Sequence, residues 1–224
     1  MATYLLVHGA WHNGEAWNRV TPLLSAAGHR VFAPSLTGHG DKAHLLDENV
    51  GLDTHVDDIV RLILDEDLTD VVLVGHSYAG LVVSSAANRV PERIAELVYL
   101  DAMVPEDGEN AIDVLPVTQF LIDRAATTGT PWRIPPMDGS FGVTDPEDQA
   151  WLRTLLSDES VLCFQQPARL DNPATAGIPR THIHCTLGAP ERRQPVGQAW
   201  ELPTGHDCMI TMPAELAGLL LKLA

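Results

Sequence analysis

Short apolar runs rich in β-branched residues alternate along the chain with segments in which apolar residues recur three and four positions apart. This alternation predicts parallel strands joined by crossover helices, which is the α/β class. The sequence therefore predicts a mostly parallel, six-stranded sheet flanked by helices. The predicted strands are Tyr4–Val7, Arg30–Ala33, Val71–Val74, Leu97–Leu100, His182–Thr186 and a short piece at Trp200–Leu202. The predicted helices are Glu15–Ala27, Thr54–Leu64, Tyr78–Arg89 and Ala214–Lys222.

The alternation is interrupted once, between about residues 105 and 179. This stretch is rich in proline and contains one clear helical pattern, which begins at Thr144 and carries Trp151 and Leu155 at helical spacing. An insertion of this length between two core strands is typical of a lid over a pocket. We therefore expect one domain over residues 1–224, with a core in residues 1–104 and 180–224 and a lid at about 105–179.

Charge narrows the classes of partner. The 224-residue chain has 30 Asp and Glu against 14 Lys and Arg, which gives a formal charge of −16. Nucleic acids and acidic membrane surfaces both repel such a protein, and no stretch approaches the roughly 20 apolar residues that a membrane helix needs. We expect a small-molecule substrate and neither a nucleic acid nor a membrane as partner. The sequence leaves open whether the protein is a monomer or a homodimer.

The start of the chain and its cysteines bear on the compartment. Residues 1–3 lead directly into the first predicted strand, without the basic and apolar segments of a signal peptide. Three scattered cysteines, Cys163, Cys185 and Cys208, make a poor disulfide framework and fit a reducing environment. We therefore expect a cytoplasmic protein.

The strongest chemical signal is Gly-His-Ser-Tyr-Ala-Gly at residues 75–80, which follows a predicted buried strand and opens an apolar helix. A serine exposes its hydroxyl at the end of a sheet from a strained turn between strand and helix, and the residues two before and two after it must be small. Gly75 and Ala79 meet this requirement. At the start of a helix, free N–H groups also favour negative charge. Ser77 is therefore the predicted catalytic nucleophile.

A second signal, Gly-His-Asp at residues 205–207, follows the last predicted strand. A serine nucleophile needs a base that accepts its proton, and the order Ser then His along the chain recurs in hydrolytic triads. Among ten histidines only His206 has this position, and it is the predicted general base. His182 and His184 share a strand face but have no partner ligands in view, so we predict no metal site.

These motifs, together with Val-His-Gly-Ala-Trp at residues 7–11, resemble the α/β-hydrolase superfamily. The chain is most similar to the plant methylesterase and hydroxynitrile lyase branch and its small bacterial esterase-like relatives. Further agreement at residues 34–40, 99–105 and 141–148 extends the resemblance over nearly the whole chain. The resemblance implies the α/β-hydrolase fold, esters of small acids as substrates and no cofactor.

The resemblance also implies an oxyanion hole, formed by the backbone N–H groups of Ala10 and Tyr78. Two further positions distinguish the esterase members of the branch from the hydroxynitrile lyases. The lyase members carry a threonine and a lysine where this chain has Gly9 and Asp207. This difference favours an esterase over a cyanohydrin lyase.

The catalytic acid departs from the family pattern. In the family the acid follows the penultimate strand, where residues 185–190 of this chain contain no Asp or Glu. Without that carboxylate the imidazole loses its correct tautomer, which in a protease cost about 10⁴ in rate. We favour Asp101, which ends the strand before the insertion. Glu191, Asp207 and a dyad without an acid remain alternatives.

The sequence predicts a carboxylesterase-like serine hydrolase that cleaves a small-molecule carboxylic ester or thioester through an acyl-enzyme on Ser77. Trp11, His76, Trp132 and Phe141 are candidate walls of the substrate pocket, although each could equally belong to the core. Two alternatives remain open. One is a repurposed lyase or cyclase of small-molecule metabolism, and the other is a ligand-binding protein with a degraded triad.

Overall fold

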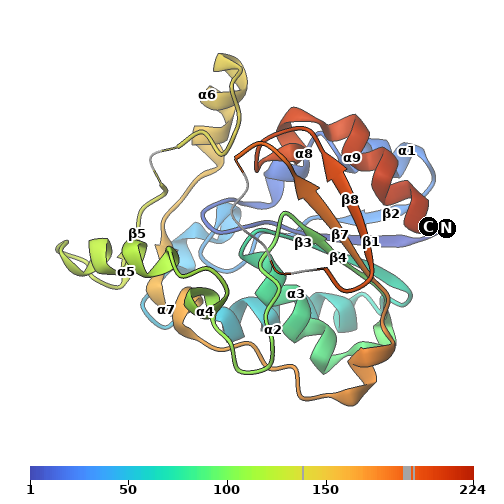
Figure 1. Ribbon diagram of the computed structural model, residues 1–224, viewed down its shortest axis with the longest axis horizontal. Coiled ribbons are helices and arrows are strands. Elements are labelled where there is room, and N and C mark those ends of the chain that lie inside the picture. Colours follow the sequence, from blue (N-terminus) through green and yellow to red (C-terminus); the bar gives the residue numbers. More distant parts are fainter. Residues whose placement is uncertain (138, 189–192, 194) are drawn as a thin grey trace.

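The computed structural model describes residues 1–137, 139–188, 193 and 195–224 (Figure 1). Six strands form one sheet in the order β2-β1-β3-β4-β7-β8, and every pair of neighbours is parallel. The predicted six-stranded sheet is therefore confirmed. The strands are β1 (Thr3–Val7), β2 (Arg30–Phe32), β3 (Val71–His76), β4 (Ile94–Leu100), β7 (Arg180–Cys185) and β8 (Gln198–Leu202).

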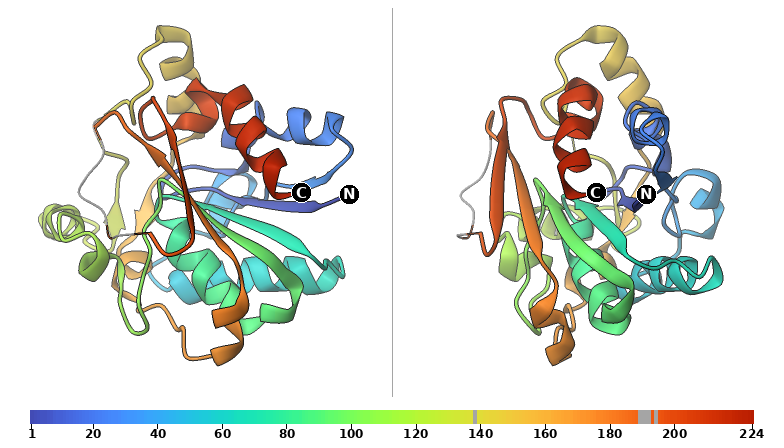
Figure 2. Two further views of the ribbon diagram at one scale, coloured as in Figure 1. Left: turned by 45° about the vertical axis from the view of Figure 1, so that its right-hand side comes forward. Right: turned by 90° about the vertical axis from the view of Figure 1, so that its right-hand side faces the viewer.

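Helices cover both faces of the sheet (Figure 2). Leu5 of β1 packs in the layer that contains α2 and α3, whereas the next residue, Leu6, packs in the layer that contains α1, α8 and α9. Because both faces of the central strands β1, β3 and β4 are buried, these strands have nearly continuous apolar sequences. The covering helices are α1 (Thr21–Ala26), α2 (Leu52–Asp65), α3 (Ala79–Arg89), α8 (Cys208–Thr211) and α9 (Pro213–Leu220).

One predicted helix, Glu15–Ala27, is wrong as a single element. The structure has a 3-10 turn, η1 (Gly14–Trp17), followed by the separate helix α1. The side chain of Asn13 caps η1 by accepting the Glu15 N–H at 2.8 Å. Pro22 lies in the first turn of α1, where its missing N–H costs nothing. A new helix therefore starts at the proline instead of one helix running through it.

Residues 105–179 lie between β4 and β7 and add no strand to the six-stranded sheet. The predicted helix here is α6, which Asp145 caps by accepting the N–H groups of Glu147 and Asp148 at 2.9 and 3.0 Å. Figure 1 shows α5 and α6 projecting from the rest of the molecule at two separate places. The elements of this insertion are α4 (Ala111–Val114), α5 (Thr118–Ala126), β5 (Arg133–Ile134), α6 (Pro146–Leu155), β6 (Glu159–Ser160), α7 (Val161–Gln165) and η4 (Pro173–Gly177).

The two ends of the chain lie side by side (Figures 1 and 2). The hydroxyl of Tyr4 on β1 donates to the Leu220 carbonyl at the end of α9 at 2.8 Å, which joins the first strand to the last helix. In the part of the chain that the structure describes, no helix is both long and apolar enough to cross a lipid bilayer.

Candidate active site

Ser77 occupies the turn between β3 and α3 with a φ of 56°, in the left-handed region that costs a non-glycine residue energy. The turn is held by its backbone. The Ser77 N–H donates to the Leu100 carbonyl at 3.2 Å, and the Ser77 carbonyl accepts the Met103 N–H at 2.9 Å. A Cβ at Gly75 would approach the Ala79 carbonyl oxygen to 2.7 Å. The need for a small residue there is therefore a property of the turn itself.

Asp101 and His206 form a short pair beside this turn. The Nδ1 of His206 lies 2.6 Å from Oδ2 of Asp101, whose Oδ1 accepts the Cys185 N–H at 2.9 Å. The Asp101 side chain is only 3% exposed, whereas that of His206 is 30% exposed. A proton on Nδ1 that is held by the carboxylate leaves Nε2 of His206 as the basic nitrogen.

The position of Asp101 follows from the sheet. It comes directly after β4, which lies between β3 and β7, and its N–H donates to the Ile183 carbonyl at 2.7 Å. Like Ser77 it has a positive φ, 46°. Because β3 and β4 are parallel neighbours, Ser77 and Asp101, which directly follow them, lie at the same end of the sheet, where the strands have their carboxyl ends. Of the alternative acids, Glu191 lies outside the described residues.

The Asp207 carboxylate pairs with His12 and makes no hydrogen bond to the His206 ring among the described contacts. Its Oδ2 lies 2.9 Å from Nε2 of His12, and both side chains are buried. Nδ1 of His12 lies 2.8 Å from the Ala10 carbonyl. Burial by itself lowers the pKa of His12, but the charge and hydrogen bond of Asp207 outweigh it and raise that pKa above its usual value. This pair connects the loop of His206 to the loop of Ala10.

Two backbone N–H groups near Ser77 are open for an oxyanion. Within the described residues, neither the Ala10 N–H nor the Tyr78 N–H donates a hydrogen bond to the protein. Both residues are buried and both line one cavity together with Ser77 and His206. The approach of the two loops depends on Gly9, because a Cβ there would lie 2.9 Å from Cβ of Ser77. The arrangement fits an oxyanion hole.

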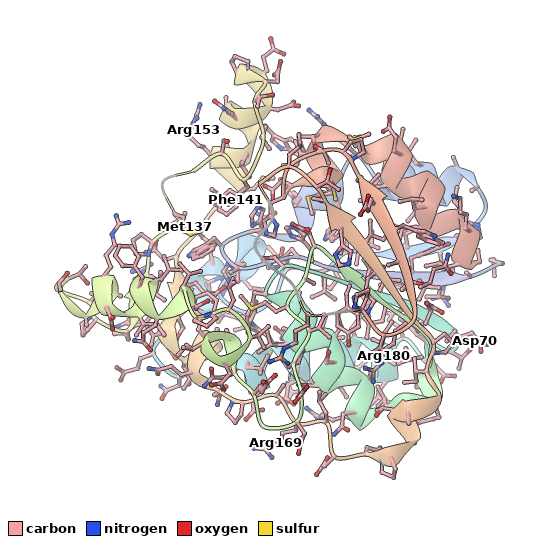
Figure 3. All side chains as sticks on the ribbon, in the orientation of Figure 1. Asp70, Met137, Phe141, Arg153, Arg169 and Arg180 are labelled. Atoms are coloured by element: carbon pink, nitrogen blue, oxygen red, sulfur yellow. The ribbon has the colours of Figure 1, made fainter. Side chains whose placement is uncertain are left out.

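The cavity has a volume of about 260 Å³ and a predominantly apolar lining. Of the four predicted pocket walls, Trp11 and Phe141 line it, with Nε1 of Trp11 fixed by a 3.1 Å hydrogen bond to the Ile134 carbonyl. Figure 3 shows Phe141 and Met137, another lining residue, between α5 and α6. The insertion also supplies Val114, Leu115, Val117, Leu121 and Phe164 to the lining, and Val104, directly before the insertion, lines the cavity as well.

The other two predicted walls lie elsewhere. His76 lies behind the base, where its Nε2–H donates to the His206 carbonyl at 3.0 Å and the two rings are 4.5 Å apart. Burial and the neighbouring histidines lower the pKa of His76 well below its usual value, so this ring is neutral. Trp132 is not among the described residues that line the cavity. Sequence reasoning did not place His182, His184 and Arg193 at the pocket, but all three line the cavity.

Two clusters among the described residues consist of His, Asp or Glu side chains that are close enough together to bind one metal ion. One consists of His76, His206 and Asp207. Its members are already engaged, since His76 donates to the His206 backbone, Asp207 binds His12, and His206 binds Asp101. The second consists of His39, His55 and Glu159 and lies apart from the serine, behind the loop of Ala10.

The sequence profile of the alpha/beta hydrolase family matches residues 4–219. This chain belongs to that family. It is 35% identical to the carbendazim hydrolyzing esterase of Nocardioides sp. over the full length of both chains. It is 30% identical to methylesterase 1 of Arabidopsis thaliana, with 99% of this chain and 95% of the relative covered. The resemblance inferred from the motifs, to plant methylesterases and bacterial esterases, is thus confirmed.

A solved structure extends the likeness to the fold. An extracellular α/β-hydrolase of a Paenibacillus species, described as sharing structural and functional homology with tobacco salicylic acid binding protein 2, superimposes with a TM-score of 0.83. The alignment covers 100% of this chain and 99% of that one at 22% sequence identity. The predicted α/β-hydrolase fold is therefore confirmed.

Proposed function

We propose that this protein is a carboxylesterase-type serine hydrolase that cleaves a small-molecule carboxylic ester or thioester through an acyl-enzyme on Ser77. One observation carries the proposal: a strained serine, a carboxylate-bound histidine and two open N–H groups meet at one apolar cavity. Relatives over the whole chain are named as esterases. Ester cleavage needs these parts and no cofactor.

In the proposed reaction His206 Nε2 takes the Ser77 proton as Oγ attacks the substrate carbonyl. The oxygen that becomes negative accepts the N–H groups of Ala10 and Tyr78. His206 returns the proton to the departing alcohol, which leaves an acyl group on Ser77. A water molecule then attacks the acyl carbonyl while His206 takes its proton, and collapse frees the acid and restores Ser77.

Asp101 is the proposed acid of this triad. At 2.6 Å its carboxylate holds the Nδ1 proton of His206 and stabilises the imidazolium that forms during attack. Its second oxygen is anchored by the Cys185 N–H, so the carboxylate has a fixed orientation. An acid supplied from the end of β4 performs the task of the carboxylate that the family places after the penultimate strand.

The cavity suggests the kind of ester. About 260 Å³ lined mainly by aromatic and aliphatic side chains accommodates a compact apolar acyl or alcohol group. The named relatives include a methylesterase and an esterase that hydrolyses carbendazim. We propose compact apolar esters as substrates, with residues 105–179 acting as the lid of a single domain. Cys163, Cys185 and Cys208 are all buried and lie far apart in the sequence, which supports a reducing, cytoplasmic location.

The proposal is tested by intact-mass labelling with a fluorophosphonate, which reacts with activated serines. We expect one adduct on the wild-type protein and none on Ser77→Ala. Ser140→Ala is the matched control, because Ser140 is a half-buried serine of the insertion that lies outside the strand–turn–helix motif, and its adduct should persist. A folded wild-type protein that forms no adduct would overturn the esterase proposal and favour the lyase or ligand-binding alternatives.

A further inference from the structure

A second cluster of ionisable side chains lies behind the oxyanion loop. It brings together His39, which precedes the 3-10 turn Gly40–Leu45, His55 on α2 and Glu159 on β6. All three are fully buried, at 0% exposure. One ligand-type atom from each lies within 4.8 Å of the others. Two imidazoles and a carboxylate converging without solvent form a set that also binds zinc in other proteins.

The outer nitrogens of both histidines are engaged. Nε2 of His55 lies 2.9 Å from the Thr37 carbonyl, which only accepts, so the proton is on Nε2 and the Nδ1 lone pair faces inward. Nδ1 of His39 lies 2.9 Å from Oγ of Ser157. Histidine ligands of metals almost always have such an outer hydrogen bond, which fixes the ring and the tautomer.

The inner atoms are close but are not arranged as a hydrogen bond. Nε2 of His39 lies 3.1 Å from Oε2 of Glu159, yet within the described residues this buried nitrogen has no partner with hydrogen-bond geometry. Neighbouring ligand atoms around a tetrahedral zinc ion lie about 3.3–3.7 Å apart, given bonds of about 2.0–2.3 Å. The nitrogen and the oxygen therefore have a spacing close to that of two ligands of one ion.

Cys163 on α7 lies beside the cluster and is the candidate fourth donor. Its Sγ lies 3.9 Å from Nδ1 of His55, and the thiol is completely buried. A bound divalent cation deprotonates a coordinating thiol. Thiolate, carboxylate and a dication then sum to zero charge, which suits a buried site.

We propose that His39, His55, Glu159 and Cys163 bind one divalent transition-metal ion, with Zn²⁺ as the best match. His39 Nε2, His55 Nδ1, Glu159 Oε2 and Cys163 Sγ are the donors, and the thiol proton leaves to solvent on binding. In the metal-free protein the Tyr78 hydroxyl lies 3.1 Å from Nδ1 of His55 and donates its hydrogen to this nitrogen. When the ion binds to Nδ1, the hydroxyl hydrogen would rotate away from it.

The site would act as a structural cross-link. It joins the loop after β2, helix α2 and the β6–α7 part of the insertion, which are distant in the sequence. Oε2 of Glu159 also accepts the Trp11 N–H at 3.4 Å, directly after Ala10. The ion would therefore fix the insertion to the loop that carries an oxyanion donor. This inference does not depend on the chemistry of Ser77.

The test is metal binding by the full-length chain after treatment with a chelator. The protein is unfolded and refolded with Zn²⁺, because the site is closed to solvent, and its metal content is measured after gel filtration. We expect one equivalent of Zn²⁺ and a higher melting temperature. Refolding with Co²⁺ should give the intense visible bands of a tetrahedral ion and a thiolate-to-metal charge-transfer band.

Variants locate the site. Glu159→Gln and His39→Gln should lose the ion, and Cys163→Ala should lose the charge-transfer band while it keeps weaker binding. Ser157→Ala, which removes only an outer hydrogen bond, should weaken binding about 10–100-fold. His29→Gln, a partly buried histidine far from the cluster that accepts the Ala2 N–H, is the control and should bind normally. Less than a tenth of an equivalent in refolded wild-type protein, or equal binding by Glu159→Gln, would overturn the proposal.

Discussion

At the scale of single residues, the sequence identifies the proposed nucleophile and base, but only the structure shows which carboxylate contacts the base. Ser77 and His206 are recognisable in the sequence because short local motifs surround them, and the acid is not, because its usual position is empty. Asp101 could be favoured only from its place at the end of a central strand. The structure adds the contact itself, a 2.6 Å pair with His206 Nδ1. The catalytic role of that pair stays a prediction.

Asp101→Asn tests that role. The asparagine can still accept the Cys185 N–H, but its amide nitrogen cannot accept the Nδ1 proton of His206. The imidazole then turns to the wrong tautomer, and we expect kcat on an activated ester to fall about 10³–10⁴-fold without unfolding. Steady-state kinetics and circular dichroism measure the two effects. Asp123→Asn, an exposed change on α5, is the control, and a near-normal kcat for Asp101→Asn would exclude it as the acid.

At the scale of elements, the loop of Ala10 and the loop of His206 are connected by one buried pair. His12 and Asp207 are 195 positions apart, so no local pattern could pair them, although Asp207 stands where the lyase members have lysine. The sequence predicted only that the Asp207 side chain could be an alternative acid. In the structure its carboxylate instead binds His12, whose other ring nitrogen contacts the Ala10 carbonyl.

A double-mutant cycle on His12→Ala and Asp207→Ala measures this connection. His12→Ala leaves the buried Asp207 carboxylate without its partner, which typically costs about 3–5 kcal/mol. Asp207→Ala leaves a buried imidazole that burial makes neutral and that lacks a hydrogen-bond partner at Nε2, so the double change should cost less than the sum. Urea unfolding gives the coupling energy. The partly exposed pair of Arg19 and Asp148, which joins the turn after η1 to α6, is the matched comparison and should couple by under about 1 kcal/mol. Equal coupling energies for the two pairs would contradict the prediction that the buried pair contributes more to stability than the pair near the surface.

The turn at Ser77 makes a second prediction for an element. Gly80 and Gly218 are both helical, but a Cβ at Gly80 would lie 1.8 Å from the Met103 carbonyl oxygen, whereas Gly218 has open space. We expect Gly80→Ala to destabilise the protein by about 2 kcal/mol or more and to lower esterase activity. Gly218→Ala should stabilise it by about 0.5–1 kcal/mol. Melting curves of the two variants decide, and a stable, fully active Gly80→Ala would contradict the packing argument.

At the scale of the whole molecule, the sheet, the place of the insertion and the helix α6 were predictable, but the other elements of the insertion were not. The central strands β1, β3 and β4 bury both faces and have nearly continuous apolar sequences, and all six strands were predicted within three residues of their observed ends. The insertion has short elements, α4, α5, α7 and the β5–β6 pair, whose apolar residues serve the cavity and the core together. For the same reason its pocket residues could only be guessed. The cluster of His39, His55 and Glu159 was missed because three distant segments form it.

The buried histidines make the stability of the whole molecule depend on pH. Burial lowers the pKa of His8, His55 and His76 below the usual 6.5. Below pH 6.5 the unfolded chain therefore takes up protons that the folded protein does not, and the free energy of unfolding falls as the pH falls. His12 has the opposite shift, so its contribution is fully present below pH 6.5 and is lost as the pH rises through its higher folded pKa.

Stability should therefore be greatest near neutral pH and fall on the acid side. Each histidine that is protonated only in the unfolded state contributes a slope of about 1.4 kcal/mol per pH unit well below its unfolded pKa. Urea unfolding at half-unit steps from pH 8 to pH 5, with a chelator present, measures that slope. His76→Gln, whose amide can still donate to the His206 carbonyl, should reduce the acid-side slope by one histidine's share. A flat profile between pH 7 and pH 5.5 would mean that these rings gain protons in the folded protein, and that the core around His8 and His76 admits a charge.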